Sequence, residues 1–414
     1  MSYDKKLISL SSVDECVWKL VDVLNRTIEL SIEIVPIKYA LDRVMAEDVY
    51  AVLDKPCRDS SAVDGYALYS DDTIGASHYN PVELTVVGYH RPGKPVEECL
   101  TRGTAIRVHT GSFIPCGANA VVMDEDVVIK GDKILVSRPI SPGSNILKRG
   151  EDFRKGDIVA SKGSIVTPFI MASIAANGIS SVKVYRKIRV SIISIGDEIV
   201  EPGSNCENCV KTYNSTTYLL SALMSRDRIF EIVYQGISPD NVDEVFDLIN
   251  KIQSNTDIVI TTGGTGISES DIIYDLVKRY GKWIFRGVKM RPGRPTSCSL
   301  INNIPIIHLS GFPVAAWAGY EAIVRPAIFR WLGVKGLERV IIYSRLKRRV
   351  PNNVGYRSFI RVSLERVNNE YLAEPYMLRG SGILSSLLRT EGYIVIPEDV
   401  EGYEKDSIVP VYLY

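Results

Sequence analysis

The sequence predicts a multidomain protein of the α/β plus β class. Residues 186–332 alternate continuous apolar runs with helical patterns, as expected of a parallel sheet whose strands are joined by crossover helices. From Pro81 to about Ser161, and again beyond Gly333, the chain forms short alternating runs separated by turns, which are typical of β domains. The 414 residues are sufficient for about two to four domains.

The overall composition argues against several classes of partner. Lysine plus arginine and aspartate plus glutamate both number 49, so the formal charge is zero and no global basic field draws the protein to nucleic acid or to an anionic membrane. No apolar run approaches the roughly 18 residues needed to span a bilayer, and the N-terminus lacks the pattern of a signal peptide. We therefore expect a cytoplasmic protein with no nucleic-acid or membrane partner.

The seven cysteines are an odd number spread along the chain, so a secreted disulfide framework is not expected. Cys206 and Cys209 form the one close pair in the sequence. Because they lack a second pair or a neighbouring pair of histidines, they make a poor zinc site. Two ordinary loop cysteines are favoured over a local disulfide.

The first part of the chain contains two predicted helices. Ser12 and Glu15 have capping-box spacing and precede apolar residues on one helical face, which predicts a packing helix over residues 12–30. A second helical stretch is expected near residues 39–45. Residues 54–72 contain a proline, a charged cluster and an Asp-Gly step, and we expect them to form an irregular turn.

Four continuous apolar runs in the α/β region predict strands that are buried on both faces. A helix that starts at Thr167 and Pro168 and ends at Gly178 precedes them. The four runs begin at Arg189, Ile229, Asp257 and Pro305.

Polar loops follow three of these strands. Open α/β sheets bind ligands at the carboxyl ends of their strands, so we expect the loops at residues 196–198, 262–266 and 310–313 to meet at one cleft. A fourth polar loop, residues 289–296, precedes the last strand and contains arginines. The cleft would therefore combine acidic and cationic groups.

The glycine-rich turn that follows the third strand predicts an anion site. Gly263, Gly264 and Gly266 allow the backbone N–H groups to approach a ligand, and the helix that follows directs its partly positive N-terminus at the same place. Ser268 and Asp271 have the spacing of a capping box at the start of that helix. The motif is neither a P-loop nor a dinucleotide fingerprint, and taken alone it favours ordinary turn geometry.

Several candidate residues also have a purely structural interpretation. Asp64 precedes Gly65, and an Asp-Gly step is common in turns. Asp271 is the third position of the predicted capping box, and Ser381 could be the N-cap of a short helix. The histidines have no companion motif, which argues against a nucleophile scheme, and we expect structural roles for His78, His90, His109 and His308.

A series of motifs in one order carries a resemblance to a known family. The chain resembles the molybdopterin molybdenumtransferases, which are MoeA-type enzymes whose eukaryotic relatives include the E domain of gephyrin. The motifs are SAVDGYAL from Ser61, RVHTGSFIPCGANAVVMDED from Arg107, NILKRGEDFRKGD from Asn145, VSIISIGDEIVEPG from Val190, TTGGTGISESD from Thr261, MRPGRPTS from Met290, LSGFPVAAWAGYEAIVRPAI from Leu309 and GSGILSSLLRTEGYIVIPED from Gly380.

The resemblance implies a domain organisation and a dimer. The central domain would be a three-layer α/β domain of the molybdopterin-binding, MogA-like type, and the C-terminal domain would be β-barrel-like. The family is dimeric, with a cleft shared between subunits. The implied parts are an N-terminal helix packed on the α/β domain (1–26), an elongated linker domain (27–50 and 141–182), an inserted β domain (51–140), the α/β domain (183–333) and the C-terminal β domain (334–414).

The resemblance also implies a reaction, in which molybdate or tungstate is joined to adenylylated molybdopterin and AMP is released with the help of Mg²⁺. The implied catalytic residues are Asp64, Glu198, Asp240 and Asp271, and the last three would hold the metal together with Asp197, because a hard cation needs carboxylate oxygens. Asp64 would come from the partner subunit. Arginine offers a fork for phosphate or oxyanion, and the implied substrate-binding residues are Thr110, Asp152, Gly263, Gly264, Thr265, Gly266, Ser268, Arg291, Arg294, Ser310, Gly311, Arg361 and Ser381.

Some positions depart from the family pattern. The turn is Gly-Gly-Thr-Gly, closer to the related molybdopterin adenylyltransferases, arginines replace the usual lysines at Arg291 and Arg294, and Ser310 and Phe312 replace family residues. The Asp-Ser-Asn that is common after the acidic loop is Asn214-Ser215-Thr216. Two other functions therefore stay open: a molybdopterin adenylyltransferase, and a non-catalytic cofactor-assembly scaffold. Contact with an adenylyltransferase is a further expectation, and the choice between molybdate and tungstate is open.

Overall fold

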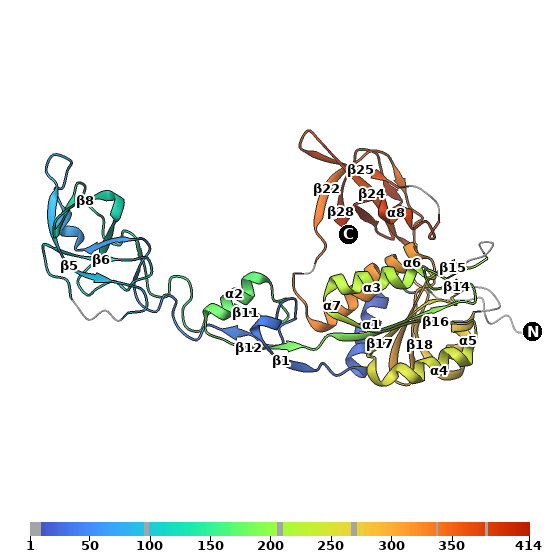
Figure 1. Ribbon diagram of the computed structural model, residues 1–414. Coiled ribbons are helices and arrows are strands. Elements are labelled where there is room, and N and C mark those ends of the chain that lie inside the picture. Colours follow the sequence, from blue (N-terminus) through green and yellow to red (C-terminus); the bar gives the residue numbers. More distant parts are fainter. Residues whose placement is uncertain (1–9, 95–98, 205–209, 266–270, 337, 377–379) are drawn as a thin grey trace, which may run out of the picture. The chain divides into compact units, whose positions relative to one another are not determined.

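The computed structural model describes residues 10–94, 99–204, 210–265, 271–336, 338–376 and 380–414. The chain divides into two compact units (Figure 1). The first comprises Met1–Glu47, Lys162–Thr167 and Val182–Tyr414, and the second comprises Asp48–Ser161 and Pro168–Ser181. The five-part division expected from the sequence is finer than this and stays a prediction. Within the described part of the chain, no helix is both long and apolar enough to cross a membrane.

The first unit contains a six-stranded mixed sheet with the order β16-β13-β17-β21-β20-β18. The four predicted strands are confirmed and run parallel, as β13 (Ile188–Ile195), β16 (Phe230–Ser238), β17 (Ile258–Gly263) and β21 (Ile304–Leu309). The antiparallel pair β18 (Gly281–Arg286) and β20 (Ser297–Ile301) was not predicted. These two strands extend one edge of the sheet, where parallel pairing is not required.

Helices cover both faces of this sheet, which confirms the three-layer α/β fold (Figure 1). Ile192, Ile260 and Ile307 pack into one apolar core, and the alternate residues of the same strands pack into a second core on the opposite face. The first core is covered by α1 (Val13–Thr27), α3 (Ser215–Asp227), α6 (Pro313–Gly319), the π-helical segment η6 (Tyr320–Val324) and α7 (Arg325–Leu332). The second is covered by α4 (Val242–Ile252) and α5 (Ile272–Tyr280).

The capping predictions had different outcomes at the two helices. Ser12 is the N-cap of α1, and its hydroxyl accepts a hydrogen bond from the Glu15 N–H at 3.2 Å. The capping box predicted at the glycine turn is wrong for Asp271, because this residue is itself the N-cap of α5 and accepts from the Tyr274 N–H at 3.0 Å. The helix begins only after it. Ser268 lies outside the described residues.

The helix expected near residues 39–45 is also wrong. The strand β1 (Ile32–Pro36) leads into a single 3-10 turn, η1 (Ile37–Tyr39). Asp42 then adopts a positive φ of 65°, which interrupts any helix. Val44 and Met45 instead make isolated bridges to Ile165 and Val184, so long-range pairing decides the conformation of this segment.

The C-terminal part of the first unit is a closed five-stranded barrel, which confirms the β-barrel-like expectation. Its strands close because β24 pairs with both β25 and β26. β19 (Met290–Arg291) pairs with β24 and so joins the arginine-rich loop to the barrel. The barrel consists of β24 (Arg357–Val367), β25 (Glu370–Pro375), β22 (Ile341–Leu346), β28 (Ile408–Leu413) and β26 (Gly392–Ile396), and smaller elements are β23 (Val350–Pro351), β27 (Gly402–Tyr403) and α8 (Ser385–Leu388).

The second unit is built on a six-stranded sheet with the order β7-β4-β6-β5-β9-β8. Its strands are β4 (Gly65–Leu68), β5 (Val82–His90), β6 (Thr104–Val108), β7 (Ala120–Met123), β8 (Val127–Lys130) and β9 (Lys133–Val136). The prediction that residues 54–72 form only an irregular turn is wrong, because β4 is a buried strand between β6 and β7. Four residues between polar turns are too few to show a strand period.

The remaining elements of the second unit are short. The helix predicted from Pro168 is confirmed as α2 (Pro168–Ala176), and Gly178 follows it with a φ of 75°. Short pairs of strands are β2 (Val49–Tyr50) with β11 (Ile158–Ala160) and β3 (Ser60–Ser61) with β10 (Ile146–Leu147).

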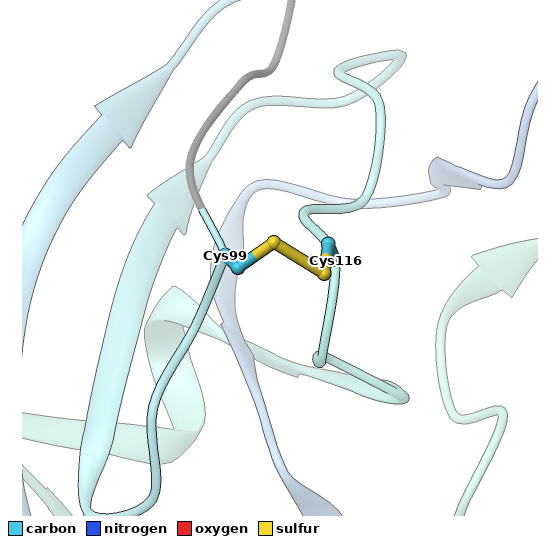
Figure 2. The surroundings of a disulfide bond; sticks show 2 residues. All are labelled: Cys99 and Cys116. Carbon is cyan, nitrogen blue, oxygen red and sulfur yellow. A yellow bond between two sulfur atoms is a disulfide. The ribbon is translucent and has the colours of Figure 1, made fainter.

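A disulfide links Cys99 to Cys116 in the second unit (Figure 2). The sequence did not indicate this pair, because its partners are 17 positions apart with no spacing signature. Cys206 and Cys209 lie outside the described residues. Among the described cysteines, Cys57 is free and exposed.

Removing this bridge is expected to destabilise the second unit. A cross-link over a loop of this length restricts the unfolded chain, so Cys116→Ser should lower the free energy of unfolding by about 3 kcal/mol. Denaturant unfolding with and without a reductant measures this, and reductant should destabilise only proteins that carry the bridge. The matched control is Cys57→Ser, whose stability should equal that of the wild type. Equal stability of the Cys116 variant and the wild type under oxidising conditions would contradict the prediction.

Candidate functional site

A cavity of about 550 Å³ lies at the carboxyl ends of the parallel strands of the first unit. Its volume is in the range of small-molecule sites, about 300–1,000 Å³. It lies next to the neighbouring strands β13 and β17, where the strand order reverses. This topological switch point is the usual ligand position in open α/β sheets. The structure brings three predicted loops to this cavity, through Glu198, Gly263, Gly264, Thr265, Ser310 and Gly311.

The glycine turn is shaped by close backbone contact. Gly263 and Gly264 have φ values of 83° and 62°, which favour glycine. A Cβ at Gly263 would lie 2.3 Å from the Ile195 carbonyl oxygen, so a side chain there would push the ends of β17 and β13 apart. Of the predicted binding residues, Gly266 and Ser268 lie outside the described residues.

Buried hydroxyls behind the cavity hold the loops, and the sequence did not single them out. The Ser194 hydroxyl lies 2.7 Å from Thr217 Oγ1 and 2.9 Å from Thr262 Oγ1, and it donates to Asn214 Oδ1 at 2.9 Å. The Thr216 hydroxyl donates to the Gly311 carbonyl at 2.7 Å. The network ties the start of α3 to two strand ends, because Asn214 is also the N-cap of that helix.

Three acidic residues from two loops lie at this edge of the sheet. Glu198 and Asp240 line the cavity. The Asp197 N–H donates to Asp240 Oδ2 at 3.4 Å, and the Asp240 N–H donates to Asp197 Oδ1 at 3.2 Å, so each loop holds the other. A Cβ at Gly196 would lie 2.7 Å from Glu198 Oε2, which shows how closely this carboxylate folds over its own loop.

Asp271 does not line the cavity with the other acidic residues. Its Oδ1 caps α5, and its Oδ2 lies 3.3 Å from Arg286 Nη2. Burial raises the pKa of Asp271. Throughout the described residues, no three histidine, cysteine or acidic side chains are grouped closely enough to hold a metal ion by themselves.

A second hollow, of about 470 Å³, contains the predicted oxyanion residues Arg291, Arg361 and Ser381. Arg361, on β24, is only 7% exposed, its Nε has no hydrogen-bond partner, and its side chain makes no ion pair with a described residue. Burial lowers the pKa of Arg361, since the charge is removed from water. The Arg291 guanidinium lies 4.5 Å from the centre of the Tyr356 ring. A buried cation without a counter-ion is expected where an anion binds.

Two predicted binding residues lie outside both hollows. Arg294 is exposed, and its carbonyl accepts from the Val288 N–H at 2.9 Å. Asp152, in the second unit, is exposed, and its N–H donates to the Lys55 carbonyl at 3.0 Å. Neither residue lines a cavity described here.

The second unit brings two of the predicted site residues, Asp64 and Thr110, into contact. Asp64 Oδ1 accepts from the Thr110 N–H at 2.7 Å and from its hydroxyl at 2.9 Å. Asp64 Oδ2 lies 3.3 Å from His109 Nδ1. These hydrogen bonds, with the Thr110 backbone foremost, lower the pKa of Asp64. The sequence predicted only a structural role for His109. Its position next to Thr110 in the sequence was the one signal for its contact with Asp64.

Three family models together cover most of the chain. The MoeA N-terminal region (domain I and II) matches residues 11–178, the probable molybdopterin binding domain matches residues 191–330, and the MoeA C-terminal region (domain IV) matches residues 343–414. The second of these matches contains the parallel strands of the α/β sheet apart from the start of β13, and the third contains most of the C-terminal barrel.

Relatives match over nearly the full length. A protein of Methanocaldococcus jannaschii is 35% identical over 423 residues, with both chains covered completely. A molybdopterin molybdenumtransferase of Bacillus subtilis is 32% identical, over 92% of this chain and 89% of its own. The crystal structure of a molybdopterin biosynthesis MoeA protein from Pyrococcus horikoshii has a TM-score of 0.84 at 36% identity, covering 98% of this chain and 100% of its own. The chain therefore belongs to the MoeA-type molybdopterin molybdenumtransferase family.

Proposed function

We propose that this protein acts in molybdenum cofactor biosynthesis as a molybdopterin molybdenumtransferase. The observation that carries the proposal is that two hollows with different chemistry share one segment of chain. Gly382 lines the larger cavity, while Gly380 and Ser381 line the hollow that contains Arg361. A phosphate-bearing pterin in the first and a molybdate or tungstate ion in the second would lie next to each other.

The larger cavity suits adenylylated molybdopterin. The glycine turn offers backbone N–H groups to its phosphates, and the strand-end hydroxyls of Thr265 and Ser310 add further donors. In the second hollow, Arg361 and Arg291 supply positive charge, and the Ser381 hydroxyl can donate to a tetrahedral oxyanion. We propose that water attacks the phosphorus of the AMP group in line, so that one P–O bond forms as the anhydride P–O bond breaks. AMP leaves with the new oxygen, and the pterin keeps its own phosphate.

The acidic residues fit a magnesium ion only as a partial ligand set. Mg²⁺ in such sites usually takes one or two carboxylates, with waters and substrate phosphates completing the octahedron. Glu198 and Asp240 fit this pattern because both line the cavity, whereas Asp271 caps a helix and pairs with Arg286. When bound, the ion would neutralise charge on the phosphoanhydride.

The metal proposal predicts a dependence on one carboxylate. Chelation of divalent ions should stop AMP release, and Glu198→Gln should raise the Mg²⁺ concentration needed for half-maximal rate by about tenfold or more, because a neutral amide is a weak ligand. Glu231→Gln, an exposed control on β16, should behave as the wild type. Activity that is unchanged by chelation would refute the role of the ion.

We also propose a homodimer in which Asp64 of one subunit serves the cleft of the other, as the family resemblance implies. Support comes from exposed apolar side chains in the first unit, since Ile32, Ile34 and Tyr39 are each more than half exposed. Light scattering on the purified protein measures its mass, and a monomer at assay concentrations would exclude the shared cleft. Contact with an adenylyltransferase stays a prediction.

The decisive test of function uses purified protein, adenylylated molybdopterin and either oxyanion. The proposal expects AMP release that depends on molybdate or tungstate, and the ratio of the two rates gives the preference. Formation of adenylylated molybdopterin from ATP and molybdopterin would instead support the adenylyltransferase alternative. If the folded dimer catalyses neither reaction, this result would support the non-catalytic scaffold.

A further inference from the structure

A line of polar contacts in the second unit ends at the Asp64 carboxylate. His109 Nδ1 lies 3.3 Å from Asp64 Oδ2, and His109 Nε2 lies 2.5 Å from the Tyr89 hydroxyl. The Arg91 Nε–H donates to the same hydroxyl at 3.0 Å. Tyr89 is on β5 and Arg91 follows this strand, whereas Asp64 precedes β4 and His109 follows β6. Residues distant in the sequence therefore converge on one carboxylate.

The direction of each hydrogen bond follows from the inventory of protons. Arginine only donates, so the Tyr89 oxygen must accept from Arg91. The single hydroxyl proton of Tyr89 is then free to point at His109 Nε2, and in this direction of the hydrogen bond Nε2 is the acceptor. In a neutral imidazole the remaining proton is on Nδ1, and that nitrogen faces Asp64.

We propose that His109 is a positioning residue for the transferase reaction, held by Tyr89 in the Nδ1–H tautomer so that it fixes Asp64 Oδ2. The inference rests on the proposed function, in which Asp64 acts on the substrate. Thr110 holds Oδ1 through two hydrogen bonds, and His109 Nδ1 lies 3.3 Å from Oδ2, close enough to hold this oxygen. The carboxylate is 54% exposed, so these donors restrict its rotation while its remaining lone pairs stay accessible to the substrate.

A purely structural role is the rival interpretation. The rings of Tyr89 and His109 pack edge to face with centroids 5.2 Å apart, and the Arg91 guanidinium lies 4.9 Å from the Tyr89 ring centre, so the contact could serve only to fasten the turn. Two substitutions separate the roles. His109→Asn keeps a donor close to the position of Nδ1 and loses the contact with Tyr89. His109→Leu loses both.

The kinetic experiment measures AMP release by the full-length protein in the presence of molybdate. His109→Leu should lower kcat about 10- to 100-fold with KM for adenylylated molybdopterin nearly unchanged, because misplacement of a reacting group acts on the chemical step. His109→Asn should restore most of kcat. The exposed His78→Leu is the matched control and should equal the wild type. The inference is overturned if His109→Leu turns over like the wild type, or if His109→Asn is as impaired as His109→Leu.

A second measurement does not depend on activity. Nitrogen NMR of protein labelled with ¹⁵N in its four histidines reports which ring nitrogen carries the proton, and His109→Asn assigns the signal. The wild type should show a protonated Nδ1 and an unprotonated Nε2, and Tyr89→Phe should populate the other tautomer. A wild-type signal protonated on Nε2 alone would refute the inference even in an active enzyme. An inactive wild type with the expected tautomer would instead count against the proposed function.

Discussion

Replacing Asp64 by asparagine is expected to lower the rate of AMP release by about 10²–10⁴-fold, the range typical of a residue that acts on protons or orients a nucleophile. Three donors point at this carboxylate, two from Thr110 and one from His109. An amide oxygen could still accept from Thr110, but the amide NH₂ would face the His109 N–H. The charge and the geometry are therefore both lost.

The same variant should fold normally. Asp64 is more than half exposed, so the hydrogen bonds that lower its pKa contribute little to global stability. Single-turnover assays and thermal unfolding of Asp64→Asn test both parts together. Asp132→Asn, an exposed aspartate in the β8–β9 turn of the same unit, is the control and should match the wild type. Wild-type turnover by a folded Asp64 variant would remove Asp64 from the mechanism.

Arg361→Gln is expected to raise KM for molybdate at least about tenfold, because the substitution removes a buried positive charge that makes no ion pair with a described residue and is available to the anion. Arg361→Lys should be intermediate, since lysine keeps the charge but not the planar fork. The same substitution should weaken molybdate binding without lowering the thermal stability of the free protein. Burial lowers the pKa of Arg361, so the charge is destabilising in the free protein and Arg361→Gln should unfold at an equal or higher temperature.

The control for this prediction lies on the same strand. Arg366, also on β24, is exposed and donates to the Asn369 side chain at 3.1 Å, so Arg366→Gln should change neither KM nor the unfolding temperature appreciably. An unchanged KM for molybdate in Arg361→Gln would locate the oxyanion elsewhere. A large loss of stability would mean that the arginine is a structural residue after all.

The carboxyl-end cavity could be predicted because its determinants are local. The runs that contain Ile192 and Ile260 are mainly apolar, as expected of strands covered on both faces, and glycine is needed at Gly263 because a Cβ there would lie 2.3 Å from the Ile195 carbonyl oxygen. Local patterns were less reliable at Asp271 and at residues 39–45. Asp271 is the N-cap of α5 instead of a position inside it, and long-range pairing, such as Val44 with Ile165, replaces the helix expected at residues 39–45.

Apolar periodicity along the chain predicts the α/β domain and the β domains, and the ordered motifs indicate the family. The separation of Asp271 from Glu198 and Asp240, the burial of Arg361 without an ion pair to a described residue, and the approach of His109 to Asp64 could be found only in the folded chain. These features depend on which side chains meet across the folded chain, and His109 and Asp64 meet because β4 and β6 are neighbours in one sheet, not because of any spacing between them.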